Sequence, residues 1–397
     1  MVTLGFVESM AILHQANDCA IFTWVAATPH TLPYPVTDTY LWLSSQCRHQ
    51  AVTTLLTHST PYHIILPVRN VEATRQLYDN LHHDHILEIT NLDLESFESV
   101  RQFVNWFTEK NIGLDVLILN AGAIFPTRQI TNDNLERTLQ TNHLSHFLLV
   151  NLLLPALLYR HSHPPSHSSD LDSHPISRVI FVSSELHSSK GGHGKGSCLN
   201  EENLQGEIEY DGLVAYRNTK LLQLLCAYQL DKIINGECID EQNIDNKTSD
   251  NDKHDDVNEN DDEDVNNDKN VNADHQQDQA QQPSLPRRSK NKLSVIALRP
   301  GFVPRTGLAR NFSLEKRLAM KYILPYMPFA RTVEQGGNVL VYAATSSDLE
   351  NFSGIYINHN CSIAPSSDES YVIEKQRFWW NVSCQLTGLS ESRVSLE

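Results

Sequence analysis

Short apolar runs alternate along most of this chain with segments whose apolar residues recur at helical spacing. The apolar runs predict seven strands, at Tyr40–Leu43, His63–Pro67, Ile86–Ile89, Val116–Leu119, Val179–Val182, Val295–Leu298 and Gly354–Ile357. Helices are expected between them, at Phe97–Phe107, Phe147–Tyr159, Leu213–Leu230 and after a Thr332–Gln335 capping box. Strands of this kind alternating with helices are typical of an α/β fold with a doubly wound parallel sheet.

Two segments fall outside this pattern. Glu241–Gln282 contains no aromatic residue, and its 11 Asp and 3 Glu against 3 Lys carry −11 of the formal charge of −17. Such a composition buries too little apolar surface to offset chain entropy, so we expect a disordered acidic insertion at about 239–290. Residues 1–39 match no pattern that we recognise. The expected organisation is therefore an N-terminal segment of unknown structure, 1–39, followed by one interrupted domain, 40–397.

Composition narrows the function. Outside the insertion the chain is only mildly acidic and shows no basic face, so nucleic acid is not an expected partner. The seven cysteines form no C-x-x-C pair, which argues against a disulfide framework and a metal site. The most apolar run, Phe147–Tyr159, has 13 residues, whereas a membrane-spanning helix needs about 20. We expect a cytoplasmic or peripherally membrane-associated protein without a transmembrane span.

A tyrosine and a lysine four residues apart are the first candidates for chemistry. Tyr216 and Lys220 lie in a helical pattern, where this spacing places both side chains on one face. A phenol has a pKa of about 10, and a nearby ammonium lowers it, which suits proton exchange at neutral pH. The same spacing occurs by chance in exposed helices, so the pair needs support from other residues.

That support comes from residues that follow predicted strands. Ser183 and Ser184 end one strand, and a hydroxyl there can hydrogen-bond a substrate oxygen or simply form a turn. Asn120–Gly122 ends another strand with small residues that let a ligand approach the backbone. Asn142 opens a leucine-rich helix. The carboxyl ends of parallel strands share one edge of the sheet, so these groups are expected at one site.

These motifs resemble those of the short-chain dehydrogenase/reductase family, whose fold is a single Rossmann-like domain. The resemblance runs from about His63 to the C-terminal region. The motifs that carry it are Val68–Asn70, Leu92–Leu94, Asn120–Gly122, Thr141–Leu144, Ser183–Ser184, Tyr216 with Lys220, and Arg299–Gly301. Within the family, Thr141–Phe147, Glu209–Lys220 and Pro300–Leu308 are most similar to the retinol dehydrogenase, WW-domain oxidoreductase and protochlorophyllide reductase branch.

The resemblance implies a catalytic set of four residues. Tyr216 would exchange a proton with a substrate hydroxyl or carbonyl while a hydride moves to or from a nicotinamide. Lys220 would lower the tyrosine pKa and bind the nicotinamide ribose. Ser184 would orient the substrate oxygen, and Asn142 would hold a water that connects Lys220 to solvent.

The resemblance also implies a cofactor site, with NADP preferred over NAD. Arg69 would accompany the 2′-phosphate of NADP, or it is an ordinary exposed loop arginine. The remaining cofactor contacts would come from residues at the strand ends, namely Asp93, Asn120, Ala121, Gly122, Pro300, Gly301 and Thr306, together with Tyr216 and Lys220.

One family signature is missing. The family's glycine-rich turn follows its first strand, but this chain has no glycine between Gly5 and Gly113. The family spacing puts Ser44, Arg48 and Gln50 at the glycine positions, ahead of an expected first helix at Ala51–His58. Side chains there would occupy pyrophosphate space, unless the Arg48 guanidinium binds a phosphate instead.

The sequence therefore supports two functions. The first is an NADP(H)-dependent oxidoreductase that interconverts an alcohol and a carbonyl on a lipophilic small molecule such as a retinoid, steroid or aldehyde, with Phe312–Pro328 and Leu186–Leu213 lining the substrate site. The second is a catalytically inactive family member that acts as a protein-interaction module, or a chain in which a foreign segment replaces the cofactor-binding N-terminus. Helices Phe147–Tyr159 and Leu213–Leu230 could pack against a second subunit, as in homo-oligomers of the family.

Overall fold

The computed structural model describes residues 24–25, 38–41, 45–59, 62–79, 85–159, 176–188, 199–236, 293–306, 308 and 311–390. The predicted insertion, Glu241–Gln282, and most of segment 1–39 lie outside the described residues.

The described residues form an eight-stranded sheet whose main path has the order β4-β3-β2-β5-β6-β7-β8, with every neighbouring pair parallel. The strands on this path are β2 (Asp38–Leu41), β3 (Tyr62–Val68), β4 (Ile86–Asn91), β5 (Val116–Leu119), β6 (Arg178–Val182), β7 (Ser294–Leu298) and β8 (Ile355–Ile357). A short strand, β1 (Trp24–Val25), pairs antiparallel with β5. The strand order reverses between β2 and β5, and ligands of doubly wound sheets bind beside such a reversal.

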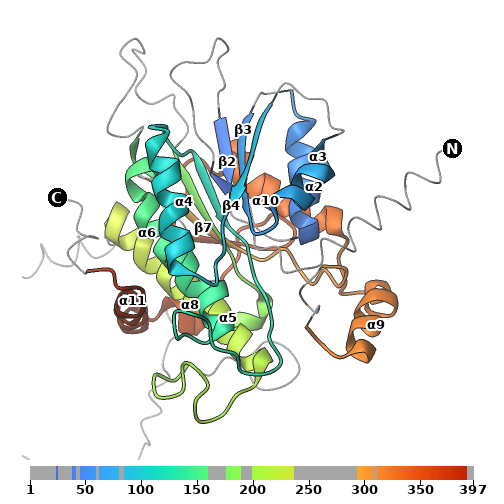
Figure 1. Cartoon of the computed structure of the whole chain (residues 1–397), viewed down its shortest axis with the longest axis vertical. Helices are drawn as coiled ribbons and strands as arrows, with labels where there is room; N and C mark the ends of the chain where they lie inside the picture. The colour runs from blue at the N-terminus through green and yellow to red at the C-terminus, as the bar shows by residue number, and fades with distance from the viewer. Residues whose placement is uncertain are drawn as a thin grey trace, which may run out of the picture.

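Helices cover both faces of the sheet (Figure 1). One layer contains α4 (Phe97–Glu109), α6 (Ser145–Leu157) and α8 (Gly212–Asn235), with α11 (Ile373–Thr387) packed on α8. The other layer contains α2 (Ser45–Leu56), α3 (Val71–Tyr78) and α10 (Val333–Thr345), and α2 packs against α10. The remaining helical elements are α5 (Arg137–Leu139), α9 (Leu314–Tyr322), the π-helical turn η1 (Gln140–Leu144) and the 3₁₀ turns η2 (Glu185–His187), η5 (Leu324–Tyr326), η6 (Ser347–Leu349) and η7 (Asp368–Tyr371).

The prediction of a doubly wound parallel sheet is confirmed, and each of the seven predicted strands overlaps a strand of the structure. Every residue of β3, β5, β6 and β7 is buried, as expected for inner strands covered on both faces, and the residues of the edge strand β8 are buried as well. The capping box is also present, since Thr332 and Gln335 bond each other's backbone at the start of α10. β1 was not predicted, because two residues provide no alternation to recognise.

The start of the first helix differs from the prediction. The sequence predicts a turn over Ser44–Gln50 and a helix at Ala51–His58, but α2 begins at Ser45. Ser44 lies outside the described residues, whereas Arg48 and Gln50 lie within the helix. Because no glycine or proline interrupts Ser45–Leu56, nothing in this stretch disfavours helical backbone angles.

One side chain joins the end of α8 to the start of β7. The Asn235 amide Nδ2 donates to the carbonyl of Leu293 at 2.8 Å and to Ser353 Oγ at 3.1 Å. Asp231, one helical turn earlier, accepts from the same amide at 2.8 Å. The chain therefore leaves α8 and enters β7 at adjacent points, although residues 237–292 separate the two in sequence.

Candidate active site

A cavity of about 1060 Å³ lies at the carboxyl ends of the sheet strands. Nine of the predicted site residues line it, namely Asn120, Ala121, Gly122, Ser184, Tyr216, Lys220, Pro300, Gly301 and Thr306. They come from the ends of β5, β6 and β7 and from the first turns of α8. The structure therefore brings together residues that lie between Asn120 and Thr306 in the sequence, nearly half of its length.

The N-terminus of α8 places Tyr216 in this cavity. Asp211 caps the helix, and its carboxylate accepts from the backbone N–H groups of Leu213 and Val214. Gly212 follows, and a side-chain carbon there would lie 2.1 Å from the carbonyl oxygen of Phe125. Only glycine lets the helix approach the loop after β5 this closely. The two features fix where α8 begins, and hence where its first turns point.

Burial sets the proton affinity of the two candidate groups. The side chain of Tyr216 is 5% exposed, and burial raises the pKa of Tyr216 to about 12, against the opposing effect of a hydrogen bond with Ser184. Burial also lowers the pKa of Lys220 to about 7. From the sequence, the lysine is expected to lower the pKa of the tyrosine. In the structure burial has the larger effect on the pKa of Tyr216, and Lys220 Nζ lies 5.6 Å from the centre of the Tyr216 ring.

Lys220 Nζ is held by two acceptors. It donates to the carbonyl of Val182 at 2.8 Å and to Gln223 Oε1 at 2.9 Å. Gln223 is fully buried, and its Nε2 donates to the carbonyl of Asn142 at 2.9 Å. A glutamine side chain therefore connects the lysine to the Asn142 carbonyl. A water held by Asn142 that links Lys220 to solvent stays a prediction. Gln223 was missed, although its position three residues after Lys220 places it on the same helical face.

The side chain of Asn142 supports the loop after β5. Its Oδ1 accepts from the N–H of Ala123 at 2.8 Å, and its Nδ2 donates to the Ala123 carbonyl at 2.9 Å. Asn142 lies in the π-helical turn η1 rather than at the start of a regular α-helix. π-helical turns often mark functional sites, because the wider turn reorients side chains and backbone carbonyls. Here the turn directs the Asn142 carbonyl to Gln223 and its amide to Ala123.

Several residues of the cavity wall are available to a ligand. Asn120 is 8% exposed, and its Nδ2 has no hydrogen-bond partner among the described residues. Gly301 adopts a φ of 82°, a left-handed conformation that favours glycine. Next to it, the Arg299 guanidinium pairs with Glu185 at 2.8 Å across the ends of β7 and β6. An unpaired buried amide beside Tyr216 and Lys220 suits a bound polar ring or sugar.

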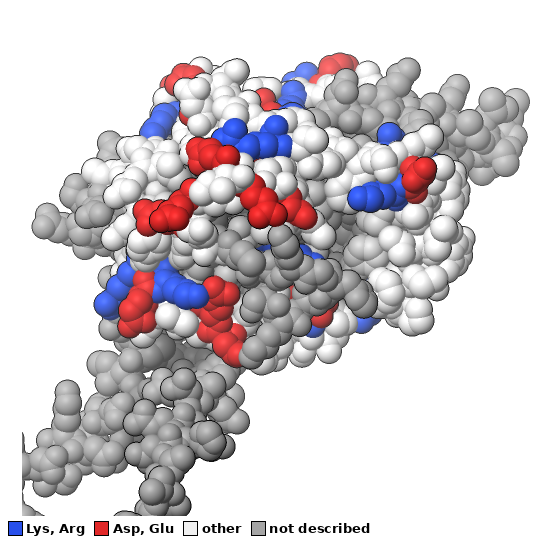
Figure 2. Space-filling model, turned by 90° about the horizontal axis from the view of Figure 1, so that it is seen from below, with Lys and Arg blue, Asp and Glu red and all other residues white. Residues whose placement is uncertain are grey.

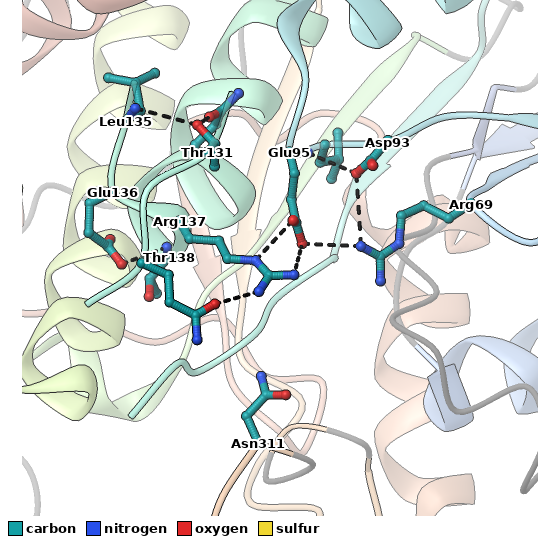
Figure 3. A network of polar contacts seen from close by, with 12 residues as sticks. Arg69, Asp93, Glu95, Thr131, Leu135, Glu136, Arg137, Thr138 and Asn311 are labelled. Atoms are coloured by element: carbon teal, nitrogen blue, oxygen red, sulfur yellow. Dashed lines mark hydrogen bonds and ion pairs between the residues drawn. The ribbon is translucent and has the colours of Figure 1, made fainter. Parts of the chain in front are cut away.

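Arg69 and Asp93 lie outside the cavity wall, in the network shown in Figure 3. Arg69 Nη1 lies 3.1 Å from Glu95 Oε1 and 4.0 Å from Asp93 Oδ1. Glu95 also accepts from both Arg137 Nε and Arg137 Nη2 at 2.9 Å. The carboxylate of Glu95 therefore lies between two guanidinium groups (Figure 3). Arg69 is engaged by carboxylates in this arrangement rather than directed into the cavity.

Where the family has its glycine-rich turn, this chain has residues with larger side chains, among them Cys47 and Arg48. Arg48 is 2% exposed, and it forms a hydrogen bond with Tyr78 that acts against the lowering of the pKa of Arg48 by burial. Cys47, its neighbour, lines the cavity. Arg48 thus packs between α2 and α3 and is absent from the cavity wall. The nicotinamide side of a dinucleotide fits the residues present, whereas the described part of α2 presents no glycine to a pyrophosphate.

Within the described residues, no helix combines the length and apolar character needed to cross a membrane.

A doubly wound sheet with a Tyr–Lys pair, a strand-end serine and a strand-end Asn-Ala-Gly defines a Rossmann-type oxidoreductase scaffold. A family model described as short chain dehydrogenase matches residues 51–186. Over those residues the chain is similar to the short-chain dehydrogenase/reductase family.

Curated proteins similar to this chain include members of the expected branch. Polyprenol dehydrogenase of Danio rerio is 29% identical over 83% of this chain and 81% of its own length. Retinol dehydrogenase 14 of Mus musculus is 26% identical over 77% of this chain and 69% of its own length. The WW domain-containing oxidoreductase of Homo sapiens is 26% identical over 82% of this chain and 62% of its own length.

Proposed function

We propose that the chain is an NADP(H)-dependent oxidoreductase that interconverts an alcohol and a carbonyl on a lipophilic small molecule. One observation carries the proposal: Tyr216, Lys220 and Ser184 converge on one cavity, at the edge of the sheet where doubly wound folds bind their ligands. A protein without turnover has no evident need for a buried tyrosine and a buried lysine in an open cavity.

The proposed proton path starts at Tyr216. In the reductive direction its hydroxyl donates a proton to the carbonyl oxygen, which Ser184 holds by a hydrogen bond. A bound nicotinamide supplies the hydride. Lys220, whose burial lowers its pKa to about 7, can return a proton to the phenolate near neutral pH. Gln223 keeps the ammonium in place and links it to the Asn142 carbonyl.

A lipophilic substrate is supported by the cavity wall. Apolar side chains line the side that faces α9 and the loop before it, among them Phe302, Phe312, Met320 and Phe329. The predicted lining segment, Phe312–Pro328, contributes to this wall only in part. Two relatives are named as dehydrogenases of polyprenol and of retinol, and lipophilic substrates of this kind would agree with such a wall.

The choice of NADP(H) over NAD(H) rests on Arg69. It follows β3 directly, where a bound adenosine ribose would lie in this fold, and no acidic residue holds that position. Binding of a 2′-phosphate would require the guanidinium to exchange Glu95 for the phosphate. We therefore expect Arg69→Ala to weaken NADPH binding and to leave NADH binding unchanged.

The test of the proposed function is removal of one hydroxyl group. Tyr216→Phe should abolish NADPH-dependent reduction of a lipophilic aldehyde, followed by the loss of NADPH absorbance. Tyr342→Phe, which removes a hydroxyl from the partly buried α10, is the matched control and should retain full activity. Turnover in Tyr216→Phe comparable to that of the native chain would exclude this mechanism.

The second candidate function is a catalytically inactive interaction module. The observation that favours it is the packing of Arg48 against Tyr78, where relatives use glycine for cofactor approach. A fluorescence titration with NADPH separates the two functions. Saturable binding at micromolar concentrations supports the enzyme, whereas a folded native chain that does not bind NADPH at all supports the module.

A further inference from the structure

Helix α9 differs from the other long helices because it contains no buried residue. It projects from the body of the molecule at the lower right of Figure 1. Several of its large apolar side chains, and those of the segment that follows, are exposed. These are Leu314 at 67%, Leu318 at 47%, Tyr322 at 58%, Ile323 at 58%, Tyr326 at 76% and Phe329 at 61%.

One side of α9 faces the cavity, and another side faces away from the fold. Lys316 and Met320, one turn apart, line the cavity. Leu314, Leu318 and Tyr322 recur at i, i+4 and i+8, which places them along another side of the helix. The helix is thus a thin wall with the cavity on one side. Its apolar stripe faces away from the fold, the reverse of an ordinary amphipathic surface helix.

Basic residues flank the apolar stripe. Arg317 and Lys321 are neighbours of Leu314 and Leu318 on the helix surface, at i+3 spacing. Residues 311–331 contain four basic residues and one acidic residue, in a chain with a formal charge of −17. Figure 2 shows the molecule from below, and its right-hand side, where α9 lies in Figure 1, is largely uncharged, with basic side chains and one acidic group beside them at its edge.

We propose that this α9 face, made of Leu314, Leu318 and Tyr322 with Arg317 and Lys321, docks onto an anionic lipid surface. Exposed leucine and tyrosine side chains beside basic residues are the combination that binds the headgroup region of such a bilayer. The basic side chains act at short range, because salt screens the distant acidic parts of the chain.

A second copy of the chain fits this face less well. In a two-fold symmetric contact the same patch lies on both subunits, so Arg317 and Lys321 would approach the same residues of the other copy. Like charges at close range oppose such a contact, and the described part of α9 offers only Glu315 to balance them. An anionic bilayer satisfies both the apolar and the basic residues.

Docking would place the cavity next to the lipid. Met320 lines the cavity from the inner side of the same helix, so only α9 would lie between the bilayer and this wall of the cavity, which suits a lipophilic substrate. This consequence rests on the proposed function, but the docking itself does not. Binding to vesicles can therefore fail or succeed independently of turnover.

The test is flotation of the full chain with vesicles, first of pure phosphatidylcholine and then of phosphatidylcholine with phosphatidylserine. We expect binding to the mixed vesicles, little binding to the pure ones, and a decrease with salt. The triple variant Leu314→Ser, Leu318→Ser, Tyr322→Ser and the double variant Arg317→Glu, Lys321→Glu should each weaken binding by at least ~10-fold. All five side chains are exposed, so both variants should fold, which an unchanged melting temperature verifies.

Matched controls change similar exposed residues elsewhere. Ile130→Ser with Ile208→Ser removes exposed apolar side chains, and Arg75→Glu with Lys375→Glu reverses two charges; both controls should bind as the native chain does. The proposal is wrong if the native chain ignores anionic vesicles, or if the α9 variants bind as well as the controls. It is also wrong if light scattering shows a native dimer that the triple variant dissociates, because the face would then be a subunit interface.

Discussion

Burial of Lys220 should make the stability of the ligand-free protein depend on pH. Its side chain is 3% exposed, and burial lowers the pKa of Lys220 from the usual 10.5 to about 7. In the unfolded chain the amine keeps its usual pKa. Between about pH 7 and 10.5 the unfolded chain therefore binds one more proton than the native state, and the free energy of unfolding rises with pH.

The size of the effect follows from the two pKa values. The free energy of unfolding should rise by about 1.4 kcal/mol per pH unit inside this window. The unfavourable contribution of the buried amine is fully present below pH 7, where it amounts to roughly 5 kcal/mol, and is relieved as the pH approaches 10.5. Tyr216 does not offset this trend below about pH 10, because burial raises the pKa of Tyr216 to about 12 and the phenol stays protonated in both states.

Urea denaturation of the native chain and of Lys220→Met, at several pH values between about 7 and 9.5 and at fixed ionic strength, measures the effect. Subtracting the two curves removes the contributions of all other titrating groups, including the buried cysteines. The difference should change by about 1.4 kcal/mol per pH unit. Lys375→Met, which removes a half-exposed ammonium paired with Glu369, should leave the slope unchanged. Parallel curves for the native chain and Lys220→Met would show that burial does not destabilise this ammonium, and the proposed proton return to Tyr216 would lose its basis.

Three other substitutions test the site. Gly212→Ala should destabilise the protein by about 2–3 kcal/mol in urea denaturation, because the added carbon meets the Phe125 backbone, and an unchanged free energy of unfolding would mean that α8 starts further from this loop. Arg48→Gly should lower the free energy of unfolding by about 3 kcal/mol or more, since it empties a buried site, removes the contact with Tyr78 and puts glycine in a helix. A decrease of less than about 1 kcal/mol would argue against a buried guanidinium. Gln223→Leu should move the amine-dependent limb of the pH–activity profile to lower pH, because the ammonium loses an acceptor, and an unmoved limb would contradict its positioning role.

The sheet and the central part of the site could be predicted from sequence. Central parallel strands are buried on both faces, so they appear as apolar runs such as Val116–Leu119, whose predicted bounds match β5. The convergence of Asn120 and Ser184 followed because residues after parallel strands share one edge of the sheet. Both inferences start from a local sequence pattern that is compatible with one arrangement only, a buried strand followed by residues at the edge of the sheet.

Other features depend on contacts that no local pattern records. Helical spacing identifies the apolar stripe of α9 but cannot say that it faces away from the fold. Similarly, the sequence shows that glycines are missing near Arg48, but not that α2 starts at Ser45 and that the arginine packs against Tyr78. Gln223 carried no signal of its own, since a buried glutamine between Lys220 and Asn142 is recognised only once η1 and α8 are placed together.

The junction held by Asn235 should allow a second folded domain to be inserted between α8 and β7. Because the Asn235 amide joins the end of α8 to Leu293 and Ser353, the geometry of the junction is set by packing and does not depend on how many residues intervene. Each doubling of an intervening flexible chain adds only about 0.6 kcal/mol to the entropy of closure. A fluorescent reporter whose own termini lie close together could be inserted between Asn235 and Leu293. Its emission would then report on the catalytic domain without a fusion at either end of the chain.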